Sequence, residues 1–204
     1  MADVVTLDAM IQRADFAVGS ADAAGTEQIQ TLSVESLSSH SMIVPMLRKP
    51  DFQRETNQWT PGQLVTFLKS YLDLELIPSV ILWRSPAYVF VIDGGHRLSA
   101  LRAWIEDDYG DGAISRKYYG NEISDDQKRI AERVRKSIEK DIGKYSHIKD
   151  ALVNPDSYDE LSVQRARNMA TRSLSLQCEA SRVFRRLLYV RRSYNEQHKE
   201  QVFS

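Results

Sequence analysis

Ser79-Val-Ile-Leu-Trp83 and Tyr88-Val-Phe-Val-Ile92 are two short apolar runs joined by a turn at Ser85-Pro86. Both runs are rich in β-branched and aromatic residues, so they predict two buried strands that pair with each other. The second run continues directly into Asp93-Gly94-Gly95-His96-Arg97, after which apolar residues recur at helical spacing from Leu98 to Ile105. This stretch therefore predicts a strand, a tight turn and a helix.

The segment before these strands carries a clear helix start. Thr60-Pro61-Gly62-Gln63 has a capping residue, a proline at the first helical position and a glutamine at the reciprocal capping position, so it predicts a helix over 61–73. Residues 42–45 resemble a short edge strand closed by proline, and the polar stretch from there to Trp59 resembles an exposed loop. We interpret Trp59 as a hydrophobic staple ahead of the helix rather than as a platform for stacking bases.

The segment after the strands is predicted to be mainly helical. Ser124-Asp-Asp-Gln127 starts a helix whose apolar residues lie four apart until Gly143, and residues 146–204 are predicted to be helical with a break near Asn154-Pro155. The expected fold class is α/β (α+β), a small mixed sheet with helices. We expect an acidic peripheral arm over 1–30, a core over 31–112, and a helical subdomain with a basic C-terminal end over 113–204.

Composition narrows the class of protein. The chain has 204 residues, 42% of them hydrophobic and 27% charged, which is typical of a globular protein of one or two domains. Its net charge of -1 hides an acidic start and a basic end. The single cysteine, Cys178, excludes an internal disulfide and fits a reducing cytoplasm. No apolar run reaches the ~20 residues of a membrane span, so we expect a cytoplasmic protein with no membrane partner.

The turn Asp93-Gly94-Gly95-His96-Arg97 is the strongest candidate site. Two glycines let the backbone approach a ligand, and the following helix offers unpaired N–H groups and a positive dipole end, which attract anions. Arg97 could hold a phosphate in a bidentate way, and His96 could donate a hydrogen bond or accept a proton. Asp93 could orient His96, hold Mg²⁺, or simply cap the helix.

The wider pattern resembles a known family. Asp93-Gly-Gly-His-Arg-Leu-Ser-Ala-Leu101 is similar to the Asp-Gly-Gln-(His/Gln)-Arg signature of the GmrSD-like N-terminal domain, also called domain of unknown function 262. Pro50-Asp-Phe-Gln-Arg54 with Trp59 resembles that family's Phe-Gln-Arg…Trp block, and residues 77–83 resemble its Ile-Pro strand. Here Gly95 replaces the usual glutamine, and the end of the chain departs from the family pattern.

The resemblance implies a ParB/sulfiredoxin-like fold whose turn binds nucleotide phosphates, in a restriction-type DNA-defence system of bacteria or phages. By the same match Gln53 and Arg54 would face the ligand together with Gly94, Gly95 and Arg97. A nucleoside triphosphate would be ligand or substrate, with Mg²⁺ as cofactor. Arg54 and Arg97 would then neutralise phosphates, while Asp93, His96 and Arg97 would form the catalytic group. An HNH-type nuclease domain or subunit is an expected partner.

A second interpretation is a non-catalytic module that binds DNA or regulates a nuclease. Contacts with DNA would come from the basic end, where Arg182, Arg185, Arg186, Arg191 and Arg192 lie close together in the sequence. A metal-dependent nickase is a third possibility, but the sequence shows no cluster of carboxylates with histidine that would support it. The aspartates at 107, 108 and 111 lack the fixed pattern of a calcium loop, and His40, His147 and His198 are too scattered for a site.

Overall fold

The computed structural model describes residues 3–16, 30–53 and 59–179. These residues form a mixed α/β fold around a six-stranded sheet with strand order β1-β3-β5-β4-β6-β2. The fold class expected from the sequence is thus confirmed. The strands are β1 (Arg13–Ala14), β2 (Thr31–Ser33), β3 (Leu47–Pro50), β4 (Val80–Arg84), β5 (Val89–Asp93) and β6 (Ser173–Glu179).

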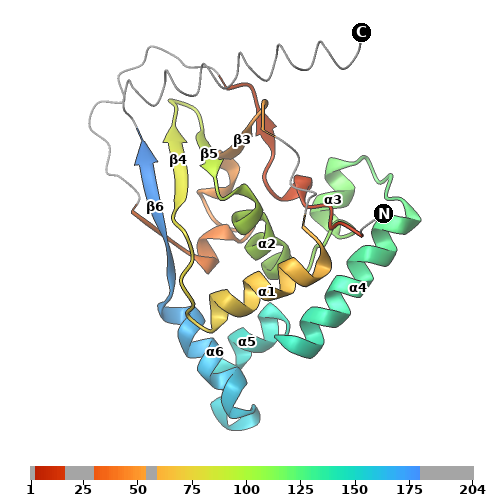
Figure 1. The fold of residues 1–204 in the computed structure, drawn as a ribbon, viewed down its shortest axis with the longest axis vertical. Coiled ribbons are helices and arrows are strands. Elements are labelled where there is room, and N and C mark those ends of the chain that lie inside the picture. The colour runs from red at the N-terminus through yellow and green to blue at the C-terminus, as the bar shows by residue number, and fades with distance from the viewer. Residues whose placement is uncertain (1–2, 17–29, 54–58, 180–204) are drawn as a thin grey trace.

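Helices gather around one face and one end of the sheet (Figure 1). They are α1 (Pro61–Leu72), α2 (Gly95–Glu106), α3 (Ala113–Tyr118), α4 (Asp125–Asp141), α5 (Tyr145–Val153) and α6 (Glu160–Thr171). Four 3-10 turns accompany them: η1 (Asp8–Met10), η2 (Val34–Leu37), η3 (Val44–Met46) and η4 (Pro155–Ser157). No helix among the described residues is long and apolar enough to cross a membrane.

The two central strands are the pair predicted from the sequence. β4 and β5 are antiparallel neighbours, and the Thr60 capping box starts α1 as expected. The side chains of β4 and β5 alternate between two hydrophobic clusters, because successive residues of a strand point to opposite faces of the sheet. Val80, Leu82, Val89 and Val91 pack against the helical layer, while their neighbours in the strands pack on the other face. The strands are buried on both sides, which explains their continuous apolar runs.

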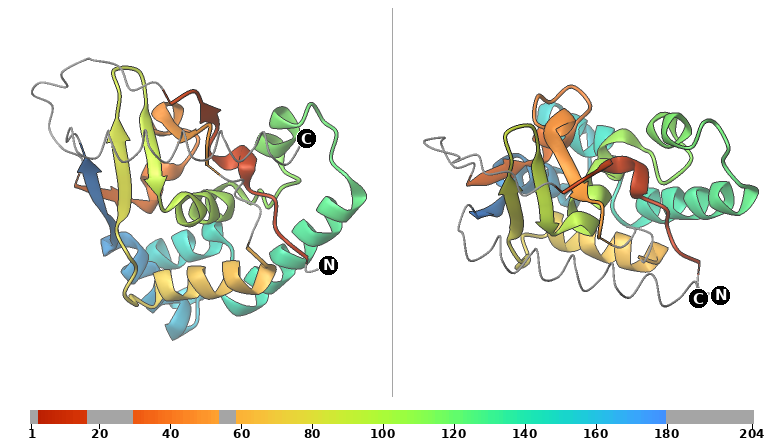
Figure 2. Two further views of the ribbon diagram at one scale, coloured as in Figure 1. Left: turned by 45° about the horizontal axis from the view of Figure 1, so that its top comes forward. Right: turned by 90° about the horizontal axis from the view of Figure 1, so that it is seen from above.

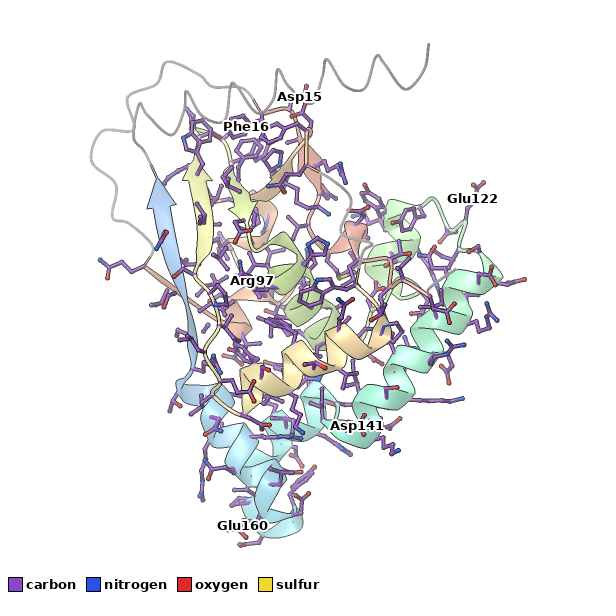
Figure 3. All side chains as sticks on the ribbon, in the orientation of Figure 1. Asp15, Phe16, Arg97, Glu122, Asp141 and Glu160 are labelled. Carbon is purple, nitrogen blue, oxygen red and sulfur yellow. The ribbon has the colours of Figure 1, made fainter. Side chains whose placement is uncertain are left out.

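An aromatic cluster covers the second face of the sheet. Phe16 packs with ring centroids 4.8 Å from Trp83, 4.9 Å from Phe90 and 5.4 Å from Phe52. Phe16 is only 1% exposed. Figure 3 shows it beside the ends of β4 and β5 that lie away from α2. A residue from the start of the chain therefore closes this side of the core.

The expected peripheral arm is wrong for residues 3–16. β1 pairs in parallel with β3, and the neighbouring apolar side chains are buried: Val5, Leu7, Ala9, Met10 and Ile11. The acidic residues of this segment suggest an exposed arm, although apolar residues that alternate with polar ones also indicate a buried strand. Residues 17–29 lie outside the described part of the chain, and the boundary expected at residue 112 stays a prediction.

Two further element predictions are wrong. Residues 44–46 form a 3-10 turn, and the strand begins only at Leu47, where it lies between β1 and β5 rather than at an edge. Residues 173–179 form a strand instead of continuing the helical segment, and this strand pairs in parallel with β4 and antiparallel with β2. Both errors have one physical cause, because the partners of these strands lie far away in the sequence. Figure 2 shows β6 standing beside β4.

Candidate functional site

Three parallel strands bring the polar residues to one edge of the sheet. β1, β3 and β5 run in the same direction, so their carboxyl ends meet at that edge. Arg13 lies opposite Lys49 in the register of β1 and β3, and β5 ends at Asp93. α2 begins immediately after this strand, so its first turn lies at the same edge. Ligands of α/β proteins commonly bind at such edges.

The turn between β5 and α2 depends on Gly94. Its φ of 91° is in the left-handed region, and a Cβ atom built there would lie 2.9 Å from Cγ2 of Val80. Both facts require glycine. Gly94 is also the N-cap of α2 and has no side chain to cap the helix, so the first amides of the helix receive no side-chain cap. The capping role considered for Asp93 is therefore wrong.

Asp93 and Arg97 form an ion pair across the turn. Nη2 of Arg97 donates to the Asp93 carboxylate at 2.5 Å, and Nη1 donates to the carbonyl of Pro78 at 2.6 Å. The Arg97 side chain is 13% exposed and the Asp93 side chain 61% exposed. Figure 3 shows Arg97 at the first turn of α2. Arg97 thus ties the turn to the segment before β4, and contact with a ligand would use its remaining N–H groups.

Gln53 also lies against the end of β5. Its side-chain nitrogen donates to the main-chain carbonyls of Val91 and Ile92, each at 2.8 Å. The main-chain carbonyl of Gln53 accepts a hydrogen bond from Nη1 of Arg13 at 2.7 Å. The short strand β3 stops pairing with β5 at Phe90, so the amide of Gln53 satisfies carbonyls beyond the ladder. The structure gives Gln53 a role in holding the site together, while its contact with a ligand stays a prediction.

His96 lies between an aromatic ring and a group of buried charges. Its ring stacks on Trp59, with centroids 5.7 Å apart and planes at 18°. Its Nε2 atom is buried and has no hydrogen-bond partner among the described residues. Burial lowers the pKa of His96, the positive charge of Lys49 lowers it further, and Asp8 and Asp93 oppose the shift. The imidazole is therefore neutral at physiological pH and able to accept a proton or a hydrogen bond.

The ring of Trp59 is packed against other side chains of the domain, as expected for a hydrophobic staple rather than for a platform that stacks on a nucleotide base. Besides covering His96, its ring makes an edge contact with Phe67 of α1 at 5.3 Å. Its carbonyl accepts a hydrogen bond from the Val5 amide at 2.8 Å. These contacts agree with the packing role expected for this residue and link residues 3–16 to the start of α1.

A buried ion pair completes this edge, and sequence reasoning missed it. Lys49 on β3 is fully buried, and its ammonium lies 2.7 Å from Oδ1 of Asp8 and 3.3 Å from the Asp8 carbonyl. Nη2 of Arg13 lies 3.5 Å from the same Asp8 oxygen. The sequence alone predicts an exposed loop at Lys49. Only its position two residues after Leu47, on the buried face of an unrecognised strand, could have revealed it.

The acidic loop after α2 is used within the fold. Asp108 is 1% exposed and accepts hydrogen bonds from the amides of Gly110, Gly112 and Ser115 and from the Ser115 hydroxyl. Arg135 of α4 pairs with both Asp107 and Asp111. Within the described ranges there is no group of three or more His, Cys, Asp or Glu side chains that could hold a metal ion. Mg²⁺ at Asp93 would therefore need oxygens supplied by the ligand.

Several predicted residues lie outside the described part of the chain. They are Arg54 and the C-terminal arginines, Arg182, Arg185, Arg186, Arg191 and Arg192. Two arginines from the start of the basic segment are described and serve the fold: Arg165 bonds to Asp73 and the Asp141 carbonyl, and Arg172 bonds to the carbonyls of Ser70 and Tyr71. Such contacts satisfy the free carbonyls at helix C-termini.

The fold and this edge define a mixed α/β domain with a glycine turn that leads into a helix beside buried cations. Residues 34–203 match the family model described as GmrSD restriction endonuclease, N-terminal domain. The chain therefore belongs to this family, whose members are domains of restriction-type defence systems. No curated protein and no solved structure gives a significant match. The family match begins after β1 and η1, so Asp8, Arg13 and Phe16 lie outside it.

Proposed function

We propose that this domain binds a nucleoside triphosphate at the edge formed by Gln53 and Asp93-Gly94-Gly95-His96-Arg97, and that it hydrolyses the triphosphate. The observation that carries the proposal is His96, whose buried Nε2 lacks a partner among the described residues beside a helix N-terminus and a buried lysine. A neutral imidazole in this position can orient or deprotonate an attacking water. The family resemblance to ParB/sulfiredoxin-like domains supports the same assignment.

The proposed roles follow from the contacts. Arg97 is held by Asp93 and the Pro78 carbonyl, so its guanidinium is oriented before a ligand arrives, which reduces the entropy lost on binding. The uncapped amides at the start of α2 would donate to phosphate oxygens. Asp93, with its largely exposed carboxylate, would be the residue that holds Mg²⁺. The metal would offset phosphate charge when bound together with the nucleotide. Arg54 would add a further cation.

Calorimetric titration with each nucleoside triphosphate and Mg²⁺, combined with an assay of released phosphate, tests this proposal. We expect wild-type protein to bind one of them and Arg97→Ala to lose that binding. His96→Gln should keep binding within a few-fold and lose about 100-fold or more in hydrolysis, the usual contribution of a general base. Arg167→Ala is the matched control, because Arg167 is exposed on α6. Thermal unfolding of each variant separates loss of function from loss of fold.

The absence of any nucleotide binding by folded wild-type protein would overturn the proposal. Hydrolysis by His96→Gln at the wild-type rate would remove His96 from the mechanism while leaving the binding site intact. In the first case the remaining interpretation is the DNA-binding or regulatory module that acts with a nuclease partner. DNA affinity that falls steeply with salt concentration would then identify phosphate contacts.

A further inference from the structure

The helix α2 carries a row of buried polar groups, and the proposed site uses only the first of them. Within the described ranges, five buried side-chain nitrogen or oxygen atoms have no hydrogen-bond partner, and three of the five lie on α2: Nε2 of His96, Oγ of Ser99 and Nε of Arg102. Side chains three residues apart in a helix are neighbours on the same side of it. The three atoms therefore form one polar stripe along α2.

The polar stripe faces the 3-10 turn η1, which packs against α2. Arg102 donates through Nη1 to the main-chain carbonyl of Met10, and Asp8 is near enough to His96 to affect its pKa. Ser99 lies between His96 and Arg102 and is 0% exposed. Burial lowers the pKa of both His96 and Arg102, because their charged forms are poorly solvated there. The stripe therefore lies where bulk water has little access.

The hydroxyl of Ser99 lacks the partner that a helix normally offers. A serine inside a helix can donate to the main-chain carbonyl one turn earlier, but Oγ of Ser99 bonds to no group in the described part of the chain. A buried hydroxyl left in this state destabilises the fold, so native proteins commonly satisfy such groups with an ordered water that makes about three hydrogen bonds. The Cβ atoms of residues at this spacing are about 5–6 Å apart, and one water can bridge their side chains. The polar stripe offers that water three candidate partners, because Arg102 leans back toward Ser99 as long helical side chains do.

We infer that a buried water joins Oγ of Ser99 to Nε2 of His96, and that Ser99 is a positioning residue for the imidazole. The inference rests on the proposed function for the role of His96 as a general base, and it deepens that function. The hydrogen bond made at one ring nitrogen decides which of the two nitrogens carries the proton. The bridge therefore holds the neutral ring in one orientation and one tautomer. It also solvates the positive charge that His96 acquires when it accepts a proton.

NMR of the full chain without nucleotide tests the bridge separately from hydrolysis. The nitrogen chemical shifts of the His96 ring, assigned with His96→Gln, report both its tautomer and its pKa. We expect a single tautomer in wild-type protein. Ser99→Ala should give a mixture of tautomers and a still lower pKa of His96, because the imidazolium loses a polar partner. Ser99→Cys keeps the size of the side chain but bonds only weakly to water, so it should change the same readings in the same direction.

The matched control is Ser137→Ala, because Ser137 is a partly exposed serine inside α4. It should leave the tautomer and the pKa of His96 unchanged. In the hydrolysis assay, Ser99→Ala should lower kcat roughly 3- to 10-fold, the contribution of one hydrogen bond, and change KM by less than about twofold. A crystal structure of the wild-type protein should show a water within hydrogen-bonding distance of both Oγ of Ser99 and Nε2 of His96.

A wild-type tautomer and a wild-type pKa of His96 in both Ser99 variants would overturn the inference, and so would a crystal structure without that water. A larger KM with unchanged kcat in Ser99→Ala would also count against it, because a positioning residue for the base should affect the chemical step. No hydrolysis by wild-type protein would refute the proposed function, while the NMR comparison would still decide whether Ser99 positions His96.

Discussion

Replacement of Phe16 by alanine tests whether the start of the chain is part of the folded domain. Phe16 is 1% exposed and lies within 5.4 Å, centroid to centroid, of Phe52, Trp83 and Phe90. Truncation of a buried phenylalanine to alanine costs about 3–5 kcal/mol, because transfer energy is lost and a cavity remains. Three edge or tilted ring contacts add to this cost, so we expect a value above the lower end of that range.

The assay is urea unfolding followed by circular dichroism. We expect Phe16→Ala to lower the free energy of unfolding by about 4 kcal/mol, and the melting temperature of a domain of this size by roughly 10 °C. Leu76→Ala is the control, because Leu76 is 99% exposed and should change the free energy by less than about 0.5 kcal/mol. A loss below about 1 kcal/mol for Phe16→Ala would refute the reasoning, since it would show that residues 3–16 are not built into the core.

Three further predictions concern the turn, the histidine and the acidic loop. Gly94→Ala should lower the free energy of unfolding by about 1–3 kcal/mol in the same urea assay, because of the positive φ and the close contact with Val80. Gly62→Ala in α1 is the control: no atom lies near the added Cβ, so it should be neutral or stabilising by up to about 1 kcal/mol. The pKa of His96 is lowered from 6.5 in the folded state, so the unfolded chain takes up this proton first as the pH falls. The contribution of neutral His96 to the free energy of unfolding is therefore fully present above about pH 6.5 and is lost as the pH falls toward the folded-state pKa. His96→Gln should flatten this part of the profile of unfolding free energy against pH. Asp108→Ala should cost about 3 kcal/mol or more in chemical denaturation, because it leaves buried amides without an acceptor; a near-neutral result would show that water replaces the carboxylate.

The part of the fold that could be predicted from the sequence depends on local signals. The capping box at Thr60, the paired runs of β4 and β5 and the glycine turn are each encoded by neighbouring residues, and the structure confirms all three. The turn at Gly94 was also recognised as part of the candidate site, although Asp93 pairs with Arg97 instead of capping the helix. Local pattern and final structure agree at these positions.

The remaining features depend on contacts that sequence spacing does not show. β1 has only two residues, too few for a periodic signal, and its partner β3 lies more than thirty positions later. Lys49 looked like a loop residue because its burial comes from Asp8 and the helical layer rather than from its neighbours in the chain. β6 follows a helical segment, and only its pairing with β4 and β2 makes it a strand.

The strand order also sets a limit on how the protein can be assembled during synthesis. β4 lies between β5 and β6, and β6 is contributed by residues 173–179, about ninety positions after β4. Until those residues have left the ribosome, one edge of β4 has no partner, although both of its faces are strongly apolar. Exposed apolar edges of this kind promote association between chains. Folding of this domain should therefore be completed only after residues 173–179 have been synthesised, and nascent chains that stall between residues 106 and 172 should depend on chaperones more than the folded domain does.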